Sequence, residues 1–117
     1  MSPANLDGVR MFVSATANDG VVDVETVVQF RQRGARVLGW YRGGRIRRGC
    51  LAGAFSGGVL RFRYVQAETS GEVHAGRSEC DLVRTPEGRM RLLERFVWTT
   101  RPGRGTNVFD EVADPTA

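Results

Sequence analysis

Apolar and polar residues alternate along most of this chain, and no long stretch shows the spacing of an amphipathic helix. Glycine-rich and Asp/Asn-containing turn signals separate the alternating segments. The pattern predicts eight β-strands. In chain order they span approximately residues 8–16, 21–32, 35–42, 45–55, 59–68, 72–83, 89–100 and 106–112.

Short loops between these strands predict that neighbours in sequence pair antiparallel. Eight antiparallel strands without a helix must protect their edges, and closing the sheet achieves this. We therefore expect an all-β fold, an eight-stranded up-and-down (meander) barrel similar in architecture to streptavidin and the calycins. An open sandwich or a half-barrel dimer is the alternative. Residues 1–112 would form one domain, and residues 113–117 a disordered tail.

The Gly57-Gly58 pair predicts the register of one hairpin, because a two-residue loop fixes which residues face each other. The predicted inward pairs are Phe55 with Leu60, Gly53 with Phe62, Leu51 with Tyr64 and Gly49 with Gln66. Small residues then oppose large ones, as the interior of a small barrel requires. Gly53 and Gly49 would make room for Phe62 and Gln66.

The same alternation predicts an interior that is unusually polar. The inward polar positions are Thr26, Tyr64, Gln66, His74, Ser78 and Glu94, with Phe62, Phe96 and Trp98 as aromatic neighbours. A buried carboxylate is costly unless it is paired or protonated. Glu94 is therefore a candidate ligand anchor or general acid–base group, unless these residues form a network that only satisfies itself. His74 is expected at the rim.

Parity also predicts details of single strands. The second strand should direct Val24, Thr26, Val28 and Phe30 inward. Arg47 would point inward near one mouth, where Glu68 could pair with it. Cys50 faces outward and Cys80 inward, which disfavours a disulfide, and with the single histidine they show no zinc spacing. We expect no metal and no cofactor.

All 17 basic residues are arginine, and the net charge of +4 permits anionic partners. Arg48, Arg61 and Arg63 share an outer face, but Phe62, Tyr64 and Trp98 point the other way, so nucleic-acid binding is disfavoured. A phosphate loop is excluded because Cys50-Leu51 replaces the required Lys-Ser/Thr pair. No apolar run is long enough to cross a membrane as a helix and no secretory signal is visible, so we expect a cytoplasmic protein without a membrane partner. Outward Val65, Leu93 and Val97 could form a homodimer patch.

The chain resembles a family of short bacterial proteins that carry the name N-acetylglutamate synthase. Their pattern reads E-T-x-x-x-[FY]-x-Q, Y-x-G-G-x-I-x-x-G-x-L-x-G, L-x-F-R-Y and E-x-[WF]-x-W. The matching positions are Glu25, Thr26, Phe30, Gln32, Tyr41, Gly43, Gly44, Ile46, Gly49, Leu51, Gly53, Leu60, Phe62, Arg63, Tyr64, Glu94, Phe96 and Trp98. Phe96 stands where tryptophan is expected. The resemblance implies a barrel in which Tyr64 and Glu94 matter, and it implies no established activity.

The enzymatic name of that family does not fit the residues. Acetyltransferases of that kind bind pyrophosphate on a glycine-containing loop that opens a helix. The nearest stretch, "RQRGAR", ends in Arg36 where a small residue is needed, and it precedes a predicted strand. We therefore exclude acetyl transfer.

Three functions follow as hypotheses. The first is binding of a small organic molecule inside the barrel, through the ligand-binding residues Thr26, Phe62, Gln66, His74, Ser78, Phe96 and Trp98, with Glu94 as the polar anchor. The second is a metal-free isomerase or cyclase, in which Glu94 is the general acid–base and Tyr64 orients the reacting group. The third is a nucleic-acid- or partner-binding module that uses Arg48, Arg61 and Arg63.

Overall fold

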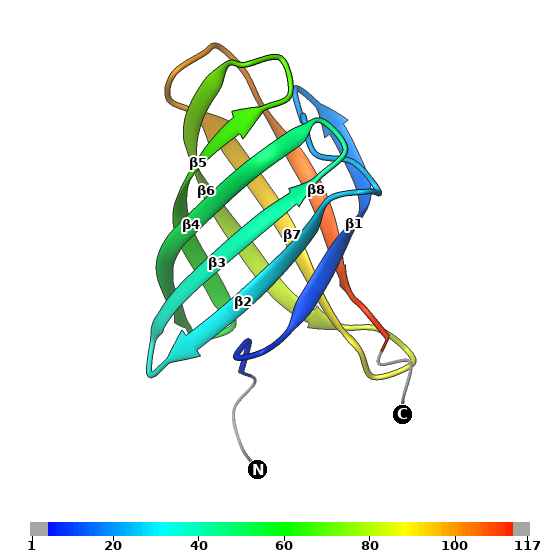
Figure 1. Ribbon diagram of the computed structural model, residues 1–117. Coiled ribbons are helices and arrows are strands. Elements are labelled where there is room, and N and C mark those ends of the chain that lie inside the picture. The colour runs from blue at the N-terminus through cyan, green and yellow to red at the C-terminus, as the bar shows by residue number, and fades with distance from the viewer. Residues whose placement is uncertain (1–4, 114–117) are drawn as a thin grey trace.

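The computed structural model describes residues 5–113, which form eight antiparallel strands and no helix (Figure 1). The strands are β1 (Arg10–Asn18), β2 (Val27–Arg33), β3 (Arg36–Gly43), β4 (Ile46–Ser56), β5 (Val59–Glu68), β6 (Val73–Arg84), β7 (Met90–Trp98) and β8 (Arg104–Glu111). Apart from Ala113, the predicted tail lies outside the described residues.

Each strand pairs with the next one along the chain, and β8 pairs with β1 to close the barrel (Figure 1). The predicted up-and-down barrel is confirmed, and the open sheet is wrong. No helix within the described part of the chain is long and apolar enough to span a membrane.

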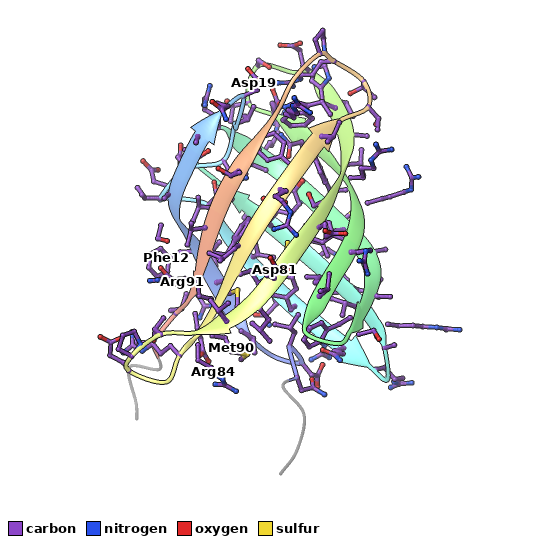
Figure 2. The ribbon with its side chains drawn as sticks, turned by 180° about the vertical axis from the view of Figure 1, so that it is seen from behind. Phe12, Asp19, Asp81, Arg84, Met90 and Arg91 are labelled. Atoms are coloured by element: carbon purple, nitrogen blue, oxygen red, sulfur yellow. The ribbon has the colours of Figure 1, made fainter. Side chains whose placement is uncertain are left out.

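The two ends of the barrel differ in what they carry. The lower end holds both termini of the described chain and the turns β2–β3, β4–β5 and β6–β7 (Figure 1). The upper end holds the connections β1–β2, β3–β4, β5–β6 and β7–β8. Viewed from behind in Figure 2, Asp19 marks the upper end and Met90 the lower end.

The hairpin of β4 and β5 has the register that its Gly-Gly turn predicts. Phe55 faces Leu60, Gly53 faces Phe62, Leu51 faces Tyr64 and Gly49 faces Gln66. The prediction that Gly49 makes room for Gln66 is wrong, however. A Cβ atom on Gly49 would collide with the ring of Tyr41, its partner on β3, so this glycine makes room for Tyr41 rather than for Gln66.

Strand β2 begins later than the alternation predicts, because residues 19–26 form a loop. Within it the Asp23 backbone N–H donates to Thr26 Oγ1 (3.1 Å), and the Thr26 N–H donates to the Asp23 carbonyl (2.9 Å). This turn places Val24 in solvent, with 68% of its surface exposed, so its predicted inward position is wrong.

The predicted contact between Arg47 and Glu68 is also wrong. The β4–β5 register shifts between Ile46 and Arg48, which buries Ile46 and leaves Arg47 exposed on the outside. A bulge of this kind inverts the parity of every position beyond it. Glu68 instead accepts a hydrogen bond from Arg101.

Candidate functional site

A cavity of about 40 Å³ lies inside the upper half of the barrel. Six of the eight strands, all but β1 and β6, contribute to its wall, and the β1–β2 loop covers it with Gly20, Val21 and Val22. The remaining wall consists of Val28, Tyr41, Leu51, Phe62, Tyr64, Gln66, Glu94, Phe96, Trp98, Asn107 and Phe109. The wall is mainly apolar and aromatic, and its polar residues include Tyr64, Gln66, Glu94 and Asn107.

Glu94 is the carboxyl group in this wall, and only 5% of its surface is exposed. Ser78 Oγ donates to its Oε2 (2.6 Å) from β6, and Asn107 Nδ2 donates to its Oε1 (2.7 Å) from β8. Burial raises the pKa of Glu94, and the two hydrogen bonds partly oppose that rise. Both carboxyl oxygens are thus engaged, and a general acid–base role would require one of them to be released.

Two buried polar atoms beside Glu94 have no hydrogen-bond partner among the described residues: the Tyr64 hydroxyl and Asn107 Oδ1. Tyr64 is 8% exposed and Asn107 is 6% exposed. Burial raises the pKa of Tyr64, which keeps the phenol protonated. An unsatisfied buried polar group costs about 1–3 kcal/mol, so two of them in one cavity call for a functional explanation.

A chain of hydrogen bonds runs from the cavity to the upper rim. The Tyr41 hydroxyl donates to Gln66 Oε1 (2.8 Å), and Gln66 Nε2 donates to Glu68 Oε2 (2.9 Å). Arg101, in the β7–β8 loop, donates to the same Glu68 oxygen (2.5 Å). Glu68 is thus bonded on both sides, and the chain fixes the orientation of Tyr41 and Gln66 in the cavity wall.

Trp98 joins the aromatic wall to the loops above it. Its ring makes edge-to-face contacts with Tyr64 (5.5 Å between ring centres) and Phe96 (5.7 Å). The Arg101 guanidinium lies 4.4 Å from the centre of the Trp98 ring, and Trp98 Nε1 donates to the Asp19 carbonyl (3.1 Å). Trp98 thus connects the β1–β2 and β7–β8 loops at the upper end of the cavity.

The structure brings six of the nine predicted site residues into the cavity wall: Phe62, Tyr64, Gln66, Glu94, Phe96 and Trp98. The other three lie beside it. Ser78 supports Glu94, and Thr26 Oγ1 donates to the Gly43 carbonyl (3.0 Å), which holds the β1–β2 loop. His74 is half-buried at the rim, bonded to Glu72 (3.0 Å) and Thr100 (2.9 Å).

Sequence reasoning missed Asn107, Tyr41 and the loop residues 20–22. Asn107 shares its parity with buried Gly105 and Phe109, so the alternation of the last strand contained a usable signal. Tyr41 has the same parity as buried Val37 and Gly39 on β3. No comparable signal existed for residues 20–22, because their position depends on how the loop turns.

Other predicted features lie apart from the cavity. Cys50 is exposed and Cys80 is buried, and both are free thiols. Within residues 5–113 no group of three or more His, Cys, Asp or Glu side chains could hold a metal ion. Val65, Leu93 and Val97 are all partly exposed, but they are divided between β5 and β7, and the predicted dimer stays untested.

The model of a family described as "Avidin-like protein" matches residues 4–112, which is nearly the whole chain. No curated protein and no solved structure matches the sequence. The family match agrees with the closed eight-stranded barrel and with the architecture expected from the strand pattern. The chain belongs to the avidin-like protein family.

Proposed function

We propose that this protein binds a small organic molecule at the upper end of its barrel. The observation that carries the proposal is the pair of unpartnered buried atoms, the Tyr64 hydroxyl and Asn107 Oδ1, on two residues that line one cavity with Glu94. Mostly apolar walls with a few directed polar groups are typical of ligand pockets. Membership of the avidin-like family supports the same conclusion.

The polar groups indicate which chemistry the ligand should present. The protonated Tyr64 hydroxyl can donate to an acceptor, and Asn107 Oδ1 can accept from a donor. Glu94 has a raised pKa, so its surroundings disfavour charge. A neutral group with a carbonyl and an adjacent N–H, as in a carboxamide or lactam, meets all three conditions.

The size of the cavity limits what enters without rearrangement. A volume of about 40 Å³ holds a few water molecules at most, since one water needs roughly 10–15 Å³ by the same measure. Drug-sized ligands occupy pockets of roughly 300–1,000 Å³. A larger ligand therefore requires residues 20–22 to move away from the mouth.

The test uses the tryptophan in the cavity as a reporter. The chain has two tryptophans, so Trp40→Phe leaves Trp98 as the only one. In that background we would titrate 2-pyrrolidinone and small carboxamides, with the corresponding carboxylic acids and amines for comparison. The neutral amides should change Trp98 emission in a saturable way, and the charged compounds should not.

Two substitutions separate specific binding from general effects on the barrel. Asn107→Ala should abolish the amide response, whereas Thr106→Ala, its exposed neighbour on β8, should leave it unchanged. Saturable binding that survives Asn107→Ala, or a preference for the charged compounds, would contradict the proposed site. The isomerase or cyclase hypothesis stays a prediction, and the double engagement of Glu94 supports binding over catalysis.

A further inference from the structure

The charges of this protein are divided unequally along the chain. Residues 27–67 contain nine of the 17 arginines and none of the 13 acidic residues. That segment therefore carries +9, and the remainder carries −5, of the net +4. It forms the four adjacent strands β2 to β5, so the excess of positive charge lies along one side of the barrel (Figure 1).

Ion pairing strengthens this division. Among residues 5–113, only Arg61 of these nine arginines forms an ion pair, with Glu79 on β6 (2.8 Å). On the other side of the barrel, acidic partners neutralise Arg91, Arg95 and Arg101. The arginines of β2 to β5 are thus available to an anionic partner.

An exposed aromatic side chain lies among these arginines. Trp40 points outward from β3 with 50% of its surface exposed, next to Leu38 at 48%. Its cross-strand partners are Gln29 on β2 and Cys50 on β4. Arg42 lies two residues along β3, and Arg48 lies diagonally opposite on β4. Phe62, Tyr64 and Trp98 point inward and are not available for stacking, whereas Trp40 supplies an aromatic ring on the outside.

We propose that this surface binds single-stranded nucleic acid. We define it as the arginine face, the outward side chains of β2 to β5 around Trp40: Gln29, Arg31, Leu38, Arg42, Arg48 and Arg63. Arginines along a strand of phosphates, with an aromatic ring for base stacking, are how proteins bind single strands without strong sequence preference. An unpaired base is required, because a base within a duplex offers no free face to Trp40.

Other occupants fit the arginine face less well. A second copy of the chain placed face to face would bring two surfaces with an excess of arginine together, and like charges oppose such a contact. A duplex is normally read by a helix or a two-stranded ribbon that enters a groove, and the described residues form neither a helix nor a protruding ribbon on this side. An anionic membrane would require a broader apolar surface than Leu38 and Trp40 provide.

The experiment measures fluorescence anisotropy of a labelled oligothymidylate of about 15 nucleotides as the full-length chain is added. Binding should weaken steadily as salt is raised, because bound phosphates release counterions. Trp40→Ala should reduce affinity by about 5- to 150-fold, which corresponds to the loss of one base–aromatic stack. Trp40→Phe keeps an aromatic ring and should retain most of the affinity.

A matched pair of charge variants localises the contact. Arg42→Gln with Arg48→Gln removes two exposed arginines from the arginine face, and should lower the slope of log affinity against log salt by about 1.4. Arg89→Gln with Arg104→Gln removes two exposed arginines from the remainder of the barrel, and should leave the slope unchanged. All variants should keep the thermal midpoint of the parent chain.

Several results would overturn the proposal. They are the absence of salt-sensitive binding, an equal loss in the two charge variants, or an unchanged affinity in Trp40→Ala. Tighter binding to duplex DNA of the same length, or to phosphatidylserine vesicles, would assign the face to another partner. The arginine face lies outside the barrel, whereas amide binding takes place in the cavity and is measured through Trp98 emission. None of these outcomes therefore bears on amide binding.

Discussion

The lower and upper halves of the barrel interior are built on different principles. The lower half contains most of the side chains that are almost completely buried, including Leu6, Met11, Leu60 and Leu92, and they are apolar. The upper half contains Tyr41, Tyr64, Gln66, Glu94 and Asn107 around a cavity. The same strands run through both halves, so the barrel separates close packing at one end from unsatisfied polar groups at the other. The effects of substitutions on the free energy of unfolding should therefore differ between the two halves in both size and sign.

The largest expected effect is on the lower half. Leu92→Ala should lower the free energy of unfolding by about 2–5 kcal/mol, because Leu92 is fully buried and its truncation leaves a void in a close-packed core. Leu93→Ala is the matched control, since Leu93 is 37% exposed on the same strand and its loss should cost less than about 1 kcal/mol. Urea unfolding followed by circular dichroism measures both. Similar losses for the two variants would contradict the packed lower half.

The next largest effect on the free energy of unfolding is expected in the upper half, at the close contact between Gly49 and Tyr41. Gly49→Ala should destabilise the barrel by about 1–3 kcal/mol, because the new methyl group collides with the ring of Tyr41. A double-mutant cycle with Tyr41→Leu isolates this contact, since leucine lacks the far end of the ring. The cost of Gly49→Ala should fall by at least about 1 kcal/mol in that background. Equal costs in both backgrounds would show that Tyr41 is not the obstacle.

Much of this division could be predicted from the alternation of side chains. A two-residue Gly-Gly turn fixed the β4–β5 register, and the parity of β7 correctly directed Met90, Leu92, Glu94, Phe96 and Trp98 inward. Such predictions succeed because a strand that shifts by one residue exposes its whole buried face. Glu94 was found in this way, as a charge at a position that the period assigns to the interior.

The predictions failed where the backbone departs from a regular strand. Val24 lies in a turn and Arg47 at a bulge, and at both places the two-residue period no longer applies. Arg101 reaches Glu68 from a loop, which no periodicity describes. The upper half depends on such irregular segments. The strand residues in its cavity wall were therefore predictable, whereas the loops that cover the cavity were not.

A third substitution should reverse the usual sign of a buried mutation. Tyr64→Phe removes a hydroxyl that has no partner, so the free energy of unfolding should stay constant or rise by about 1 kcal/mol. The same change should abolish amide binding in the upper half. Tyr41→Phe is the control, because the Tyr41 hydroxyl donates to Gln66, and its loss should destabilise by about 1 kcal/mol. A clear loss of stability in Tyr64→Phe would show that its hydroxyl already has a partner.

The smallest effect at mildly acid pH, and the most informative about the upper half, should come from Glu94→Gln. A glutamine side chain can still accept from Asn107 and bond to Ser78, so near pH 5 the variant should lie within about 1 kcal/mol of the parent. The difference should appear as pH rises. Burial raises the pKa of Glu94 above its ordinary value of 4.5, so between the two values the folded chain keeps a proton that the unfolded chain has released.

That difference in bound protons fixes the sign of the pH dependence. Within this window the folded state binds more protons, so the stability of the parent chain falls as pH rises, by at most about 1.4 kcal/mol per pH unit from this group. Glu94→Gln lacks the titration and should lose that decline. Glu79→Gln is the opposite control, because the pKa of the exposed Glu79 is lowered by hydrogen bonds from Arg95 and Arg61, and its contribution is present above 4.5 and lost as pH falls below it. If the stability of Glu94→Gln and that of the parent change in parallel with pH above 4.5, Glu94 does not titrate as a desolvated group.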